Sequence, residues 1–185
     1  MEKLFENILE DDEKIVKTFK PNKAKLYAST FFSVILCCFF PLLVSILGIL
    51  IPDEFGYKPD ALFVLIPISL FILVLILTWV FLSIYYKNVY YAYSNKRIII
   101  RSGILGVDYK SLDMSMIGAV DVYVSVIDKI LRKNTGSVTY GSMASPMNGN
   151  TGSLYRFSHI ETPYETCKEI KTAINSFKES KKQNN

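Results

Sequence analysis

The sequence contains a single histidine, and this scarcity excludes several kinds of catalytic and metal site. His159 has no cysteine, aspartate or second histidine at the spacing of metal ligands, so we expect an ordinary strand residue there. Residues Gly136–Gly141 begin like a phosphate loop, but Ser142 and Met143 stand where that loop requires Lys followed by Ser or Thr. No nucleophile elbow or paired acidic motif surrounds the other serines and aspartates. The sequence therefore predicts no catalytic residue, no cofactor and no metal, and a non-enzymatic protein.

Cysteine is also scarce, with three residues in the whole chain. Cys37 and Cys38 lie in a long apolar run, and Cys167 falls on a predicted helix. Because no CxxC or Cys/His spacing exists, we expect neither a disulfide framework nor a zinc site. We expect these side chains to act as small apolar residues.

Charged residues are missing from two long stretches, residues 26–51 and 61–86. At about 1.5 Å per residue, a helix over either stretch is longer than the roughly 30 Å hydrocarbon core of a bilayer. The preceding residues 1–25 carry six acidic residues, and no small-residue cleavage site follows the first stretch, which argues against a signal peptide. We therefore predict a hairpin of two transmembrane helices joined by an outside loop, residues 52–60.

The orientation follows from the lysines and arginines that flank the two stretches. The connecting loop has one lysine against three acidic residues, whereas residues 87–185 hold 14 of the 21 Lys and Arg residues and 8 of the 17 Asp and Glu residues. We expect a plasma membrane protein with both termini cytoplasmic and a basic domain beneath an anionic leaflet. The flanking cations are Lys17, Lys20, Lys23 and Lys25 before the hairpin, and Lys87, Lys96, Arg97 and Arg101 after it.

The segments outside the hairpin have the short, alternating pattern of strands. Before the hairpin we expect an amphipathic helix within residues 1–12 and a strand or extended connector over residues 14–20. After it we expect a brief helical turn or bend at residues 113–117 and a short helix over residues 126–132. A loop rich in Gly, Ser and Asn follows at residues 141–152. The predicted strands are residues 88–93 and 97–101, which form a hairpin, then 107–112, 119–124, 136–140 and 154–160.

The C-terminal segment predicts an amphipathic helix. Thr162, Pro163 and Glu165 supply an N-cap residue, the proline favoured at the first helical position and the glutamate of a capping box. The apolar residues that follow recur at helical spacing, so they must pack against the strands. They are Cys167, Ile170, Ile174 and Phe177.

These elements predict a membrane-anchored α+β protein. Its soluble part is a small antiparallel β barrel or two-sheet roll that the C-terminal helix covers at one end. We expect a cytoplasmic lead-in (1–25), the transmembrane hairpin (26–86), the folded domain (87–178) and a frayed polar tail (179–185).

The sequence resembles the bacterial PH (pleckstrin-homology-like) domain family in its membrane-flanked form. The matching pieces occur in the family's order: the lead-in Glu13–Lys20 before Pro21, the strand-turn-strand Tyr91–Gly106, the segment Ser111–Val122 and the helix Ser125–Arg132. After that helix the family often has a G-x-G, which this chain lacks, so the loop geometry there differs. The resemblance implies a PH-like barrel and does not imply phosphoinositide binding, because a fold does not fix a function.

One cluster of cations is a candidate binding site. Arg97 and Arg101 are four residues apart on a predicted strand and therefore share a face, and Lys96 precedes them. In eukaryotic PH domains, basic residues around the first hairpin bind phosphorylated headgroups, and arginine suits bidentate phosphate contacts. The three residues are therefore candidate contacts for an anionic headgroup, charges that hold the domain against anionic lipid, or part of a solvated strand face.

The leading functional hypothesis is a non-enzymatic, membrane-anchored interaction module that binds a protein partner or its own copies. An anionic lipid headgroup sensor is one alternative, and an accessory subunit of a transport complex is another. The two apolar stretches carry no intramembrane charge of the kind that marks ion pathways, so a transport role would need oligomers. Nucleic acid is not an expected partner for a membrane-anchored chain with a sequence pI of about 8.8.

Overall fold

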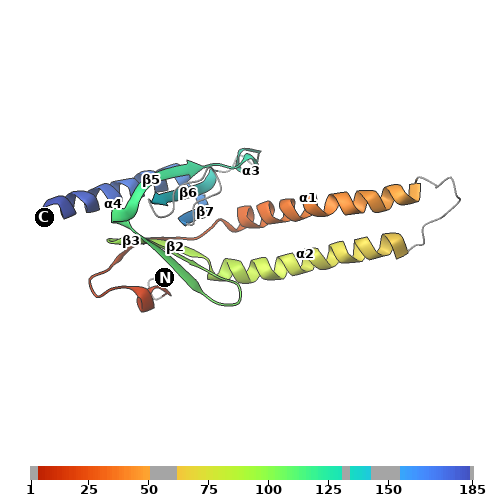
Figure 1. The fold of residues 1–185 in the computed structure, drawn as a ribbon, viewed down its shortest axis with the longest axis horizontal. Helices are drawn as coiled ribbons and strands as arrows, with labels where there is room; N and C mark the ends of the chain where they lie inside the picture. The colour runs from red at the N-terminus through yellow and green to blue at the C-terminus, as the bar shows by residue number, and fades with distance from the viewer. Residues whose placement is uncertain (1–3, 51–61, 131–133, 143–154, 184–185) are drawn as a thin grey trace. The chain divides into compact units, whose positions relative to one another are not determined.

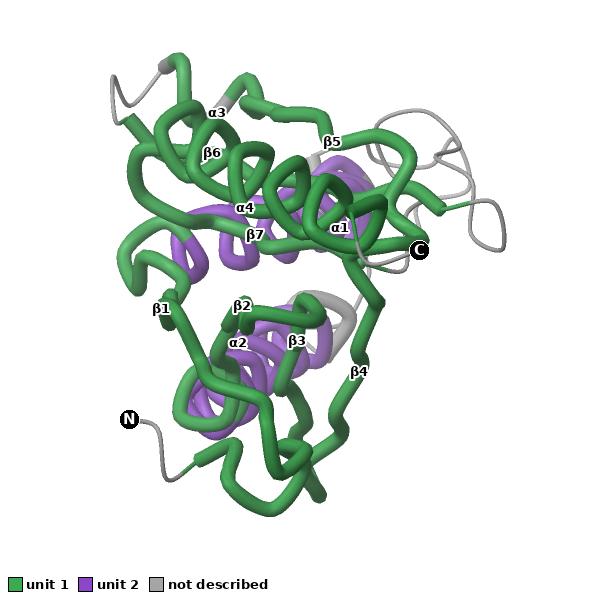
Figure 2. Tube along the Cα trace, turned by 90° about the vertical axis from the view of Figure 1, so that its left-hand side faces the viewer, with its two compact units in different colours: residues 1–25, 85–185 green, residues 26–84 purple. Residues whose placement is uncertain are grey.

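The computed structural model describes residues 4–50, 62–130, 134–142 and 155–183. The chain divides into two compact units, one of residues 26–84 and one that joins residues 1–25 to residues 85–185 (Figure 2). The expected outside loop (52–60) lies outside the described residues, as does most of the expected loop 141–152.

The unit of residues 26–84 contains most of two helices, α1 (Lys23–Leu50) and α2 (Leu62–Asn88) (Figure 1). The start of α1, up to Lys25, and the end of α2, from Tyr85, belong to the other unit. Among the described residues, these helices are long and apolar enough to cross a membrane. Their large apolar side chains are exposed, with Phe40 69% and Trp79 58% accessible. A helix of a soluble protein would bury such side chains against a core.

The other unit contains a four-stranded antiparallel sheet in the order β1-β2-β3-β4. The lead-in supplies its first strand, because β1 pairs with β2 in a register that places Phe19 opposite Tyr91. The lead-in is therefore part of the folded domain rather than a separate segment. The strands are β1 (Ile15–Phe19), β2 (Tyr90–Ser94), β3 (Arg97–Ser102) and β4 (Asp108–Asp113).

A second antiparallel sheet has the order β5-β6-β7. The predicted bend is a 3-10 turn, η3 (Met114–Met116), which leads from one sheet to the other. Within the described residues the strands form two separate ladders, so the predicted barrel is not closed and the two-sheet form is the observed one. The remaining elements are β5 (Ile117–Tyr123), α3 (Val126–Ile130), β6 (Thr135–Ser142) and β7 (Tyr155–Glu161). Each predicted strand is present, with ends shifted by a residue or two.

The core lies between the two sheets and under the C-terminal helix. The Phe157 ring stacks on Tyr91 with 4.9 Å between centroids and meets the edge of Tyr140 at 5.0 Å. Helix α4 (Pro163–Gln183) begins at the predicted proline and buries Cys167, Ile170 and Ile174 in this core. The predicted apolar stripe is thus confirmed, and the helix continues through residues 179–183, where a frayed tail was expected.

A smaller apolar cluster covers the opposite face of the first sheet. Phe5 of the lead-in is fully buried against Ala92 and Ile99, which are also fully buried. In the described part of the lead-in, the amphipathic helix expected within residues 1–12 is reduced to one 3-10 turn, η2 (Glu6–Ile8). The neighbouring apolar side chains of Leu4, Ile8 and Leu9 also pack against this cluster.

Candidate functional site

The predicted cation cluster lies on β3 and on the turn before it. Ile98 and Ile100 point into the main core, whereas Ile99 belongs to the cluster beneath the lead-in. Strand alternation therefore places Arg97 and Arg101 on the lead-in side of the sheet, on one shared face. The two arginines have different neighbours, however, and the predicted cluster divides into two sites.

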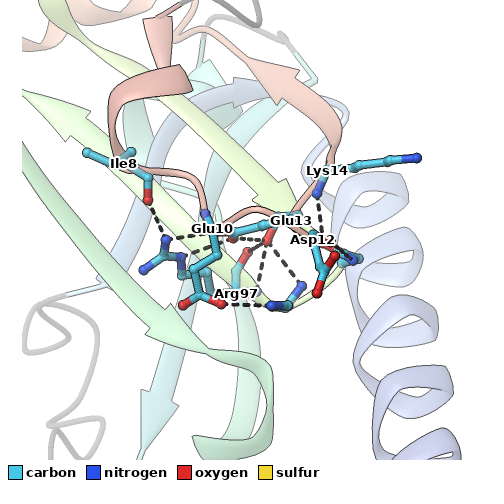
Figure 3. Close-up of polar contacts among 9 residues, drawn as sticks. Ile8, Glu10, Asp12, Glu13, Lys14 and Arg97 are labelled. Carbon is cyan, nitrogen blue, oxygen red and sulfur yellow. Dashed lines mark hydrogen bonds and ion pairs between the residues drawn. The ribbon is translucent and has the colours of Figure 1, made fainter.

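Arg97 is held by a buried carboxylate of the lead-in. Its Nε and Nη2 atoms donate to the two oxygens of Glu13 at 3.0 and 2.8 Å, and Nη2 also donates to the Ile8 carbonyl at 2.6 Å (Figure 3). The Ser94 hydroxyl donates to the same carboxylate. Burial alone would raise the pKa of Glu13, but the hydrogen bonds from Arg97 and Ser94 outweigh it and lower that pKa below its usual value.

Lys96 and the turn before it are also fastened to the lead-in. The Lys96 ammonium lies 2.7 Å from the Glu10 carboxylate in an exposed ion pair. The Asn95 side chain donates to the Asp12 carbonyl at 3.1 Å and accepts from the Lys14 amide at 3.0 Å. Lys96 and Arg97 are therefore each paired with a carboxylate of the same chain, with which an added anion would have to compete.

Arg101 belongs instead to a group that we call the aromatic-basic cluster: Lys20, Tyr86, Tyr90 and Arg101. The Lys20 ammonium lies 4.4 Å from the Tyr86 ring centre and 4.5 Å from that of Tyr90, and it donates to the Tyr90 hydroxyl at 3.0 Å. The Arg101 guanidinium lies 5.7 Å from the Tyr90 ring, and its buried Nε has no hydrogen-bond partner among the described residues. Such cation–ring contacts are favourable by about 0.5–1 kcal/mol where they are exposed.

The sequence pattern did not indicate Lys20 or Tyr90 as partners of Arg101. The pairing of Tyr90 with Arg101 across β2 and β3 brings the ring to the guanidinium. Lys20 lies near Tyr90 because β1 pairs with β2 in the same sheet. The sequence predicted either a strand or an extended connector for residues 14–20.

A groove of about 370 Å³ runs between β5 and α4. On the strand side it is lined by Val120, Asp121 and Val122. Since β5 pairs only with β6 among the described strands, it is an edge strand that can accept a further strand. The helix side is lined by Tyr164, Cys167, Lys168, Lys171, Thr172 and Asn175.

The groove has an apolar floor and a basic rim. Cys167 is buried, while Lys168 and Lys171 are exposed and outnumber the single carboxylate of Asp121. Burial raises the pKa of the Cys167 thiol, so it remains protonated and unreactive at neutral pH. Sequence analysis missed this groove, because it depends on the helix crossing beside an edge strand that lies far from it in the chain.

A buried ion pair joins the start of α1 to α3. The Lys25 ammonium lies 2.7 Å from the Asp128 carboxylate, and their side chains are 1% and 3% exposed. Ser125 and Thr135 donate to the same carboxylate. Burial by itself would raise the pKa of Asp128, but the hydrogen bonds from Lys25, Ser125 and Thr135 lower it overall.

Comparison with known proteins gives one family. Residues 34–174 match the family model for the bacterial PH domain. No curated protein and no solved structure matches the chain.

Proposed function

Because the chain belongs to the bacterial PH domain family, we propose that it is a non-enzymatic interaction module anchored in the plasma membrane by α1 and α2. The charge-free length and the exposed apolar side chains of both helices support the anchor. The positive charges that flank them favour a cytoplasmic lead-in and a cytoplasmic domain.

The groove between β5 and α4 is the observation that carries the proposal, and its occupant is an extended, acidic segment of a partner protein. An extended segment adds to an edge strand through main-chain hydrogen bonds, and side-chain pockets then provide selectivity. Val120 and Val122 offer apolar contacts, and Lys168 and Lys171 offer the opposite charge to an acidic segment.

The test uses two synthetic peptides, one alternating Glu with Val and one alternating Lys with Val. Each is labelled with fluorescein and titrated into the full chain in detergent. We expect the acidic peptide to bind more tightly than the basic one. The affinity for the acidic peptide should fall as salt is added, because salt screens the attraction to the lysines. Amide NMR shifts should centre on β5 and α4.

Charge reversal in the groove supplies the matched control. Lys168→Glu with Lys171→Glu should weaken the acidic peptide by about tenfold and strengthen the basic one. Lys181→Glu with Lys182→Glu makes the same change in net charge on the same helix, outside the groove lining, and should have little effect. Equal effects of the two pairs, or binding that never distinguishes the peptides, would refute the groove as the binding site.

A second candidate function is contact with an anionic lipid headgroup through Lys96, Arg97 and Arg101. Among the described residues Lys96 and Arg97 are paired with Glu10 and Glu13, whereas Arg101 forms a ring contact and no ion pair, so Arg101 is the main candidate for this contact. Native mass spectrometry of the full chain with phosphatidylglycerol or phosphatidylcholine tests it. Arg101→Ala should lose retained phosphatidylglycerol while Lys181→Ala, at an exposed lysine near the end of α4, keeps it. Equal losses would indicate only general attraction between the domain and anionic lipid.

A further inference from the structure

The turn between β3 and β4, residues 103–107, carries large apolar side chains that the protein does not cover. Leu105 is 100% exposed, and Ile104 and Val107 are 42% and 39% exposed. Scattered exposed apolar residues are common, but a contiguous group at a hairpin tip marks an interaction surface.

The backbone of this turn is closed tightly at Gly103. Gly103 has φ +153°, and a Cβ there would lie 1.8 Å from the Gly106 carbonyl oxygen. Only glycine can therefore occupy position 103, and the turn closes tightly on itself. The exposed side chains of Ile104 and Leu105 lie between this glycine and Gly106.

The turn is fastened to the last residue of α2. The Asn88 side chain donates to the Gly103 carbonyl at 3.1 Å, so the tip lies next to the final turn of that helix (Figure 1). Helix α2 ends at Asn88, directly after Tyr86 and Lys87. The preceding Tyr85 packs against the main core of the domain. Tyrosine and lysine at the end of an apolar helix are typical of the membrane–water interface.

Further basic and aromatic side chains surround the base of the turn. Arg101 precedes it on β3, beside the Tyr90 ring. Tyr109 and Lys110 follow it on β4 and are exposed, and Asp108 is the acidic residue at this base. Apolar residues at a tip with cations and tyrosines behind them match the change from acyl chains to headgroups.

We propose that the turn at residues 103–107 is a membrane-inserting tip, which seats Leu105, Ile104 and Val107 in the leaflet from which α2 emerges. The inference rests on the proposed membrane anchor, because it requires the end of α2 to lie at the bilayer surface. The tip gives the domain an attachment to lipid besides its covalent links to α1 and α2, and it thereby restricts the orientation of the domain.

Tryptophan quenching by lipids with brominated acyl chains tests the tip in the full chain. Trp79 is the only tryptophan, so the native protein reports on α2, and a Trp79→Phe background silences it. In that background Leu105→Trp should lose fluorescence in brominated vesicles of phosphatidylcholine and phosphatidylglycerol, and its emission should shift to the blue. Met116→Trp is the matched control, because Met116 is 62% exposed and follows the opposite end of β4. Its fluorescence should be unchanged by bromine and quenched by iodide in the water.

The outcomes separate the tip from the anchor. If Trp79 of the native chain is quenched by bromine and Leu105→Trp is quenched only by iodide, the tip is refuted and the anchor stands. If Trp79 is also unaffected by bromine, the anchor itself is refuted. Equal bromine quenching of Leu105→Trp and Met116→Trp would refute a specific tip, since the domain would then lie broadly on lipid. Val107→Trp provides a second reporter and should behave like Leu105→Trp.

Discussion

At the scale of single residues, the most consequential interactions are the two buried carboxylates and their cations. Glu13 lies 84 positions from Arg97 in the sequence, and Asp128 is likewise distant from Lys25 in the sequence. Strand alternation predicted that Arg97 and Arg101 share a face, because that depends only on local geometry. It could not predict which of the two is neutralised, since the answer depends on where the lead-in returns to the sheet.

The buried pair of Lys25 and Asp128 makes a sharp stability prediction. Asp128→Asn leaves the Lys25 ammonium buried without its counter-charge, and we expect a loss of about 3–5 kcal/mol in the free energy of unfolding. Chemical denaturation of the full chain in detergent measures it. The double variant Lys25→Met with Asp128→Leu removes both charges and should recover much of the loss. A single variant as stable as the native chain would contradict the buried pair.

The single histidine gives a prediction about pH. Burial, together with the nearby Lys25 ammonium, lowers the pKa of His159 to about 4. The unfolded chain binds this proton near pH 6.5, so between pH 6.5 and 4 it holds more protons than the folded chain. The contribution of His159 to stability is therefore complete above pH 6.5 and declines as the pH falls toward 4.

NMR titration of the imidazole measures this pKa without ambiguity, because no other histidine is present. We expect a midpoint near pH 4, and His159→Asn should remove this part of the acid sensitivity. An imidazole that titrates near its usual pH of about 6.5 would contradict the burial of His159.

At the scale of secondary structure, the least expected element is the lead-in. It supplies β1 and also covers one face of the sheet through Phe5. The strands after the hairpin were predictable, because alternation and turn residues mark them, and the C-terminal helix was predictable from its 3.6-residue period. Closure of the sheets was not, because it depends on edge pairing between strands far apart in sequence. The sequence likewise left open whether residues 14–20 form a strand, because β1 is a strand only when β2 pairs with it.

The packing of Phe5 against the first sheet can be tested by hydrogen exchange of individual amides. Phe5→Ala should weaken the docking of the lead-in by about 3–5 kcal/mol, as truncation of a buried aromatic residue does. Hydrogen exchange of the β1 amides should become faster, whereas that of Val138 in the central strand of the other sheet should not change. Val16→Ala is the control, since the Val16 side chain on β1 is 60% exposed. Unchanged exchange in β1 of the Phe5→Ala variant would show that the lead-in does not depend on Phe5.

At the scale of the whole molecule, the domain is built from both ends of the sequence. A fragment of residues 87–185 lacks β1, the Glu13 partner of Arg97 and the Lys25 partner of Asp128. Binding experiments therefore need the full chain. This arrangement of the domain also determines the membrane topology. Residues 1–25 and 85–185 share one unit, so they must lie on the same side of any membrane that the helices cross.

Cysteine labelling in cells tests the membrane anchor and this topology together. Asp11→Cys, Lys58→Cys and Lys182→Cys are made separately in a chain whose three native cysteines are replaced by serine. Intact spheroplasts then receive a membrane-impermeant maleimide. We expect Lys58→Cys to be labelled at once, and Asp11→Cys and Lys182→Cys to react only after the membrane is permeabilised. Labelling of Asp11→Cys or Lys182→Cys in intact spheroplasts, or release of the chain from membranes by alkaline carbonate, would contradict it.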